Sequence, residues 1–146
     1  MAELFVDTSA WYPAVVASHG DHSTVAEALH DALAAGARLV TTNLVVMETH
    51  ALLLHRANRG AALTFARTVY EPPTVVVTSG LELERSAITD WLSRYADQDF
   101  SLADGVSFAV MKSRGISQAL TLDAHFGIAG FELVPAGRPR PRSRRR

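Results

Sequence analysis

The sequence predicts an α/β fold, a three-layer α/β/α domain around a parallel sheet of four to five strands. Short β-branched or apolar runs alternate with longer helical patterns, which is the order of βαβ units. The first apolar run lies close to the N-terminus, indicates a buried strand and ends at Asp7. A carboxylate there lies at the carboxyl edge of the sheet, where open α/β folds bind ligands.

In the first half of the chain, clear signals mark the boundaries between elements. Asp7 and the hydroxyl residues after it indicate that the first strand ends and a helix begins. Pro13 is tolerated in the first turn of this helix. Gly36 ends the second helix, whose apolar residues recur at helical spacing, and Asn43 caps the third. These signals predict helix 9–18, helix 23–35, strand 38–41, helix 43–58 and helix 60–70.

The second half repeats the alternation after Pro72 and Pro73 break the chain. A β-branched run follows, and Ser101 later opens a helix that ends at Gly115. The predicted order is strand 74–78, helix 81–95, loop 96–100, helix 101–115, strand 118–122, a short turn or helix from 123, and strand 131–134.

Length and composition fit a single globular domain. The chain has 146 residues, of which 48% are hydrophobic and 20% charged, so it can bury a core and disorder is not expected. The absence of cysteine excludes disulfides, thiolate zinc sites and cysteine nucleophiles. Without a secretory leader pattern or an apolar run of membrane-spanning length, the sequence predicts a cytoplasmic protein with no membrane segment.

Charge is divided unevenly along the chain. Six of the 14 basic residues are arginines in the last nine positions, and all 15 acidic residues precede them. The body therefore carries a net charge of −7 and the tail +6. Such basic arms commonly contact nucleic acid or acidic partners, and a solvated terminus without a role is an equal alternative.

Four acidic residues are candidates for a functional site, although three of them also fit structural roles. Asp7 and Asp123 each follow a strand and precede a helical start, so either could be a helix cap. Asp104 lies three residues after Ser101, as in a capping box. Taken one at a time, these three residues are weak evidence for a site.

Glu48 is harder to explain as a structural residue. Its neighbours three and four positions away on the predicted helix are apolar: Leu44, Val45, Ala51 and Leu52. A carboxylate buried on that face would need a partner from elsewhere or a metal ion. The alternative is that Glu48 lies at the edge of the apolar stripe and reaches water.

Together the four carboxylates predict a cation site at one rim of the sheet. All four follow strand ends or lie in the first turns of helices that start near that rim. Two carboxylates about 5 Å apart repel by about 3 kcal/mol at an effective dielectric constant near 20, so the cluster needs protonation or a cation. Oxygen ligands without cysteine favour Mg²⁺ or Mn²⁺, ions that commonly act on phosphates.

In their local sequences these positions resemble the motifs of PIN-domain ribonucleases, specifically the toxins of VapBC-type toxin–antitoxin pairs. The motifs are Asp7-Thr8-Ser9, Val46-Met47-Glu48-Thr49, residues 100–108 around Asp104 and residues 120–126 around Asp123. The resemblance covers residues 4–134 and departs from the family pattern at the arginine-rich end. It therefore predicts a PIN-like nuclease domain over 1–135 and a separate tail over 136–146.

The resemblance implies metal-assisted hydrolysis of RNA phosphodiester bonds. Asp7 and Asp104 would ligate one or two Mg²⁺ ions directly (Mn²⁺ being an alternative), and Glu48 and Asp123 would ligate or hold bound water. Hydroxide would attack in line and leave a 5′-phosphate and a 3′-hydroxyl. Ser9 would hydrogen-bond a carboxylate or the phosphate, and a role as a helix cap is equally compatible.

The resemblance also implies a cognate antitoxin that covers the active site, and a homodimer as the building unit. The apolar helical surfaces at 44–54 and 65–69 could make such contacts, and core packing would explain them as well.

Other readings stay open at this point. His125 could touch the phosphate or simply pack, and Asp97 and Asp99 could extend the negative site or be solvated loop residues. The main alternative function is a catalytically silent PIN-like module that binds RNA or protein. A phosphatase of the haloacid dehalogenase type would need an acid at position 9, where this chain has Ser9. DNA as the substrate also stays open.

Overall fold

In the computed structural model, residues 2–136 are described, and they form one five-stranded parallel sheet in the order β3-β2-β1-β4-β5. The strands are β1 (Glu3–Val6), β2 (Arg38–Thr42), β3 (Thr74–Val77), β4 (Gln118–Leu120) and β5 (Glu132–Val134). The predicted α/β/α fold and its parallel sheet are confirmed, with the strand number at the upper end of the predicted range.

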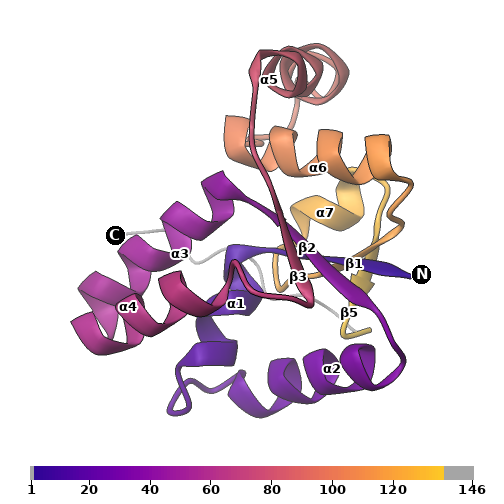
Figure 1. Ribbon diagram of the computed structural model, residues 1–146. Helices are drawn as coiled ribbons and strands as arrows, with labels where there is room; N and C mark the ends of the chain where they lie inside the picture. The colour runs from indigo at the N-terminus through magenta and orange to yellow at the C-terminus, as the bar shows by residue number, and fades with distance from the viewer. Residues whose placement is uncertain (1, 137–146) are drawn as a thin grey trace.

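Helices cover the sheet on both faces, with α6 on one side and α2 on the opposite side (Figure 1). The helices are α1 (Thr8–Val15), α2 (His22–Ala34), α3 (Asn43–Arg56), α4 (Arg59–Thr68), α5 (Leu81–Ala87), α6 (Leu102–Arg114) and α7 (His125–Ile128). A π-helical turn, η1 (Ile88–Leu92), continues α5. In the described part of the chain, no helix has the length and apolar character needed to cross a bilayer. The arginine-rich tail predicted over 136–146 lies, from residue 137 on, outside the described residues.

Several predicted elements are longer than the structure has them, and two of them end where other contacts begin. The predicted helix 81–95 changes at Ile88 into the π-helical turn, where the Ser93 N–H donates to the Ile88 carbonyl at 2.8 Å. This wider turn accompanies the burial of Trp91 against the ring of Phe108. The predicted strand 118–122 ends at Leu120, because the residues that follow make hydrogen bonds to side chains around Asp7.

The core packs around β1, which is the middle strand of the sheet, and its neighbour β4. Phe5, Leu120 and Phe108 are fully buried, and the Phe108 ring packs edge-on against Phe126 at 5.0 Å. Val6 pairs with Leu120 in the parallel ladder between β1 and β4. The residues that follow these two strands therefore emerge side by side at the carboxyl edge of the sheet.

Candidate active site

Three of the four predicted acidic residues come together at this edge. Asp7 follows β1 and caps α1, Asp123 follows β4, and Asp104 lies in the first turn of α6. Each of the three residues is less than one tenth exposed. Oxygens of Asp104 and Asp123 lie within 4.8 Å of one another and of a ring nitrogen of His125. The sequence-based placement of these three carboxylates at one rim is therefore what the structure shows.

Asp104 takes part in a helix cap and also lies in the acidic cluster, two roles that the sequence analysis treated as alternatives. Its backbone N–H donates to the Ser101 Oγ at 3.0 Å, and its Oδ2 accepts from the Ser101 N–H at 3.2 Å. The two bonds complete a capping box at the start of α6. The same carboxylate is 7% exposed and faces His125, so the cap fixes Asp104 inside the acidic cluster.

A network of hydroxyl groups holds the Asp7 carboxylate. The Ser9 Oγ donates to Asp7 Oδ2 at 2.8 Å, and the Thr121 Oγ1 donates to the same oxygen at 3.2 Å. The Ser9 backbone N–H also donates to Oδ2, at 3.3 Å, as expected of a helix cap. Ser9 therefore makes the hydrogen bond to a site carboxylate that was one of its two expected roles. Thr121 makes a similar bond but was not among the residues predicted from the sequence.

Burial raises the pKa of Asp7 from 3.8 to about 6, against the hydrogen bonds from Ser9, which lower it. The negative charges of Asp104 and Asp123 raise the pKa of Asp7 further. The two carboxylates are thus close enough to Asp7 to disfavour its ionised form. A cation among the three would reverse this penalty, because it favours every carboxylate in its charged form.

His125 is also a member of this cluster, although its role was left open in the sequence analysis. Its Nδ1 lies 3.4 Å from Asp104 Oδ2 and 3.7 Å from Asp123 Oδ1. Its backbone N–H donates to Asp123 Oδ1 at 2.9 Å, and its ring packs edge-on against Phe100 at 5.1 Å. The signal that could have found it is the Asp-x-His spacing, which lets an Asp after a strand bond the backbone two residues on.

Glu48 differs from its prediction. It lies in the second turn of α3, but its side chain is exposed, so the expectation that it is buried on the apolar face is wrong and the alternative, an edge position that reaches water, is the one that holds. The buried face of α3 is formed by Val45, Val46, Thr49 and Leu53. Glu48 is still carried near the rim, because the hydroxyl of its neighbour Thr49 lies 3.3 Å from that of Thr8, the residue after Asp7. Among the other acids, Asp97 and Asp99 are exposed in the loop before α6.

The donor set fits a divalent cation. Asp104, Asp123 and His125 bring ligand atoms within 4.8 Å of one another, and the buried carboxylate of Asp7 lies near this group, close enough for Asp104 and Asp123 to raise its pKa. Carboxylate oxygens are the ligands that Mg²⁺ and Mn²⁺ prefer. Burial is the main cause of the raised pKa of Asp7, and the negative charges of Asp104 and Asp123 add to it, so a cation at this site would relieve part of the penalty.

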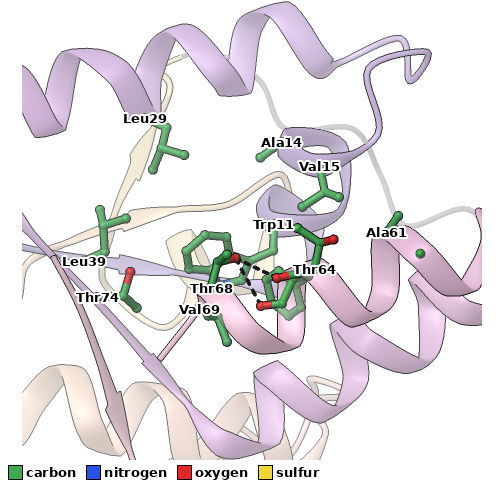
Figure 2. Close-up of a pocket in the computed structure, with 12 residues that line it drawn as sticks. Trp11, Ala14, Val15, Leu29, Leu39, Ala61, Thr64, Thr68, Val69 and Thr74 are labelled. Atoms are coloured by element: carbon green, nitrogen blue, oxygen red, sulfur yellow. Dashed lines mark hydrogen bonds between the residues drawn. The ribbon is translucent and has the colours of Figure 1, made fainter. Parts of the chain in front are cut away.

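A separate apolar cavity of about 460 Å³ lies away from the acidic cluster. Side chains from α1, α2, β2 and α4 point into it (Figure 2). Its large apolar lining residues are Trp11, Val15, Leu29, Leu39, Phe65 and Val69. None of the acidic site residues lines this cavity, so the fold carries an apolar surface distinct from the candidate active site.

Comparison with known proteins gives one answer at the levels of sequence and structure. The PIN domain family model matches residues 4–132. The chain is 33% identical to the 23S rRNA-specific endonuclease VapC20 of Mycobacterium tuberculosis, in strains CDC 1551 and H37Rv, over 90% of this chain and 97% of the relative. The crystal structure of M. tuberculosis VapC20, described as a sarcin-ricin loop cleaving toxin, superposes with a TM-score of 0.78 at 32% identity, covering 88% of this chain and 95% of that one. The chain therefore belongs to the PIN domain family and, within it, to the VapC-type toxins.

Proposed function

We propose that this VapC-type protein is an endoribonuclease that hydrolyses RNA phosphodiester bonds with a Mg²⁺ centre held by Asp7, Asp104 and Asp123. The observation that carries the proposal is the convergence of these three buried carboxylates at the carboxyl edge of the sheet. Local structural roles would explain the capping by Asp7 and the capping-box contact of Asp104, but they would not explain why these two carboxylates and that of Asp123 are buried close to one another.

When bound, the cation would acidify a water molecule and offset the charge that develops on the scissile phosphate. The protein's own residues hold the ligands in place. The capping box fixes Asp104 on α6, and Ser9 and Thr121 fix Asp7 at the end of β1. Asp123 is oriented by the backbone N–H of His125. These hydrogen bonds restrict the orientation of the carboxylates that would hold the cation.

Glu48 has a more peripheral part in this proposal. Its exposed position on α3 suits a contact to metal-held water or to the substrate better than a buried ligand position. We therefore expect Glu48→Gln to weaken RNA cleavage more than it changes the thermal stability of the metal-free protein. Asp104→Asn, in contrast, removes a buried charge and should change both quantities.

The substrate class follows from the relatives. The two matching curated proteins are named as 23S rRNA-specific, so ribosomal RNA is the substrate that we propose for this chain. The silent binding module remains the second candidate, and activity measurements separate the two functions.

The test is cleavage by the purified protein without antitoxin. Total RNA, intact ribosomes and DNA are incubated with Mg²⁺ or with a chelator, beside Asp7→Asn and the loop variant Asp97→Asn. We expect cleavage of ribosomal RNA that requires the metal, persists in Asp97→Asn and falls in Asp7→Asn by more than the roughly 10–100-fold typical of outer-shell changes. A folded wild type that cleaves no RNA but binds it would favour the silent module.

The proposal includes the antitoxin and a homodimer as partners. The apolar cavity between α1, α2 and α4 has room for large apolar side chains of a partner helix. Phe65 and Val69, from the stretch 65–69 for which partner contact and core packing were both left open, line this cavity and are themselves buried in the core. We therefore propose the cavity as the antitoxin's main contact and expect Ala61→Trp, which would fill it, to weaken antitoxin binding. Met47 and Leu54 are exposed on α3 and are our candidates for the dimer contact, to be checked by light scattering.

A further inference from the structure

We propose that Thr121 is a positioning residue of the metal centre, which together with Ser9 fixes one oxygen of Asp7 and leaves the other to the cation. The inference rests on the proposed function, since it concerns the same acidic site. It assigns a role to a buried hydroxyl on the strand-end segment that also carries Asp123.

The two oxygens of the Asp7 carboxylate have different surroundings. Oδ2 accepts three hydrogen bonds, from the Ser9 N–H, the Ser9 hydroxyl and the Thr121 hydroxyl. Within residues 2–136, every hydrogen bond to the Asp7 side chain ends at Oδ2, and Oδ1 receives none. The protein therefore holds one oxygen firmly and presents the other.

The direction of these bonds is set by the backbone. The Leu122 N–H donates to the Ser9 Oγ at 2.9 Å, and the Asp123 N–H donates to the Thr121 Oγ1 at 3.0 Å. Each hydroxyl thus accepts from a fixed donor, so its single proton is left for Asp7 Oδ2 or for the other hydroxyl, and the carboxylate is the stronger acceptor of the two. The two hydroxyl oxygens are 3.0 Å apart, within hydrogen-bond distance, so Ser9 and Thr121 form a pair of hydroxyls at the same carboxylate oxygen.

This pair connects strand ends that lie far apart in the sequence. Thr121 contacts Asp7 across 114 positions, and its hydroxyl also holds the backbone of Asp123. One side chain therefore sets the spacing between two proposed ligands. Thr121 is 2% exposed, so bulk water has little access to replace its hydroxyl. Outer-shell hydrogen bonds of this kind orient metal ligands.

The experiment measures the binding of Mn²⁺ to the purified full chain by electron paramagnetic resonance, with calorimetry as a second method. Thr121→Val keeps the shape of the side chain and removes the hydroxyl. We expect its Mn²⁺ affinity to fall about 10–100-fold, the typical effect of losing an outer-shell partner. Thr121→Ser restores the hydroxyl and should bind Mn²⁺ within about threefold of the wild type.

Thr41→Val is the matched control. Thr41 is also fully buried, on the neighbouring strand β2, and its hydroxyl donates to the Val6 carbonyl at 2.9 Å without touching the Asp7 carboxylate. A purely structural loss would appear in Thr41→Val and Thr121→Val alike, as a lower melting temperature. We expect only Thr121→Val to lose Mn²⁺ affinity.

A second pair of variants keeps the test decisive if Thr121→Val does not give a cooperative melting transition. Thr121→Cys replaces the hydroxyl by a weak S–H donor of similar shape, so its Mn²⁺ affinity should fall relative to Thr121→Ser. Equal Mn²⁺ affinity of the folded Thr121 variants and the wild type would overturn the inference alone. A wild type that binds no Mn²⁺ would overturn the proposed metal centre and this inference with it.

Discussion

The imidazole of His125 faces the carboxylate of Asp104, with Nδ1 lying 3.4 Å from Oδ2. The same nitrogen is 3.7 Å from an oxygen of Asp123, so the ring lies between two buried carboxylates. A ring N–H in this position can donate to either carboxylate and soften their repulsion. In the metal-free protein, His125 thus does part of what a cation would do.

This position predicts that His125→Ala destabilises the protein more when no divalent cation is bound than when one is bound. In a chelator the variant should lose about 1 kcal/mol of unfolding free energy, the typical value of one hydrogen bond. Addition of Mg²⁺ should reduce the difference from the wild type, because the cation then offsets the carboxylate charges. Thermal melts with chelator and with Mg²⁺ measure this, with the exposed His30→Ala as control. An equal loss in both conditions would contradict the prediction.

The raised pKa of Asp7 predicts a pH-dependent gain of stability in Asp7→Asn. Burial and the neighbouring carboxylates disfavour the charged form, so the wild-type protein loses stability as the pH rises from about 4 through 6. The cost of ionising Asp7 is on the order of 3 kcal/mol, since each tenfold change in the acid constant is worth about 1.4 kcal/mol. In a chelator, Asp7→Asn should therefore melt several degrees above the wild type near neutral pH.

The gain should shrink as the pH falls toward 4 and disappear below about pH 3, where Asp7 is neutral in both the folded and the unfolded chain. Asp97→Asn, in the exposed loop, should show neither effect. With Mg²⁺ present near neutral pH, the wild type should be stabilised and Asp7→Asn should not. A melting difference that is independent of pH would show that the substitution acts through packing or hydrogen bonding instead.

The positions of Asp7, Asp104 and Asp123 could be predicted because they depend on local signals. Strand-ending and helix-capping residues are recognisable in the sequence, and parallel strands bring their carboxyl ends to one edge. Glu48 was misplaced because helical periodicity locates a buried face only to within about one residue. The stripe that packs is centred on Val46 and Thr49, which leaves the intervening Glu48 at its exposed border.

The contacts of Thr121 and His125 could not be predicted in the same way. Thr121 bonds Asp7 across 114 positions, and His125 meets Asp104 across 21, so neither contact leaves a periodic trace. The π-helical turn at Ile88–Leu92 was also missed; it coincides with the burial of Trp91 against Phe108, a contact between residues far apart in the sequence that no local pattern reports.

The packing of α6 predicts that Gly105→Ala is destabilising. A Cβ at Gly105 would lie 2.7 Å from Leu92 Cδ1 and 3.0 Å from the Cβ of Ala87, so α6 and the α5–η1 segment would have to separate. Overpacking of this kind costs about 1–3 kcal/mol, and the better helix propensity of alanine returns up to about 1 kcal/mol. We expect a net loss of about 1 kcal/mol in thermal or urea unfolding.

The same displacement should reach the site, because Gly105 follows Asp104 directly. Mn²⁺ affinity should therefore fall in Gly105→Ala together with stability. Gly127→Ala is the control, since its added Cβ would make only an ordinary contact, 3.4 Å from Leu133 Cδ1. Unchanged stability and Mn²⁺ affinity in Gly105→Ala would mean that Leu92 moves aside and the two helices do not.

At the opposite end of β1 from Asp7, an ion-pair network predicts a stability effect that leaves the site unchanged. The Glu3 carboxylate accepts two hydrogen bonds from Arg114, at 2.8 and 3.1 Å, and one from Arg38 at 2.8 Å. The hydrogen bonds from Arg114, supported by Arg38, lower the pKa of Glu3 below its usual 4.5.

Glu3→Gln should cost about 1 kcal/mol near neutral pH, because the arginines are partly exposed and screened. The stabilisation is present above about pH 4.5 and is lost as the pH falls below it, so the variant and the wild type should converge in acid. Thermal melts across this range measure the convergence, while Mn²⁺ affinity should not change; a loss of Mn²⁺ affinity would show that the network also positions Asp7.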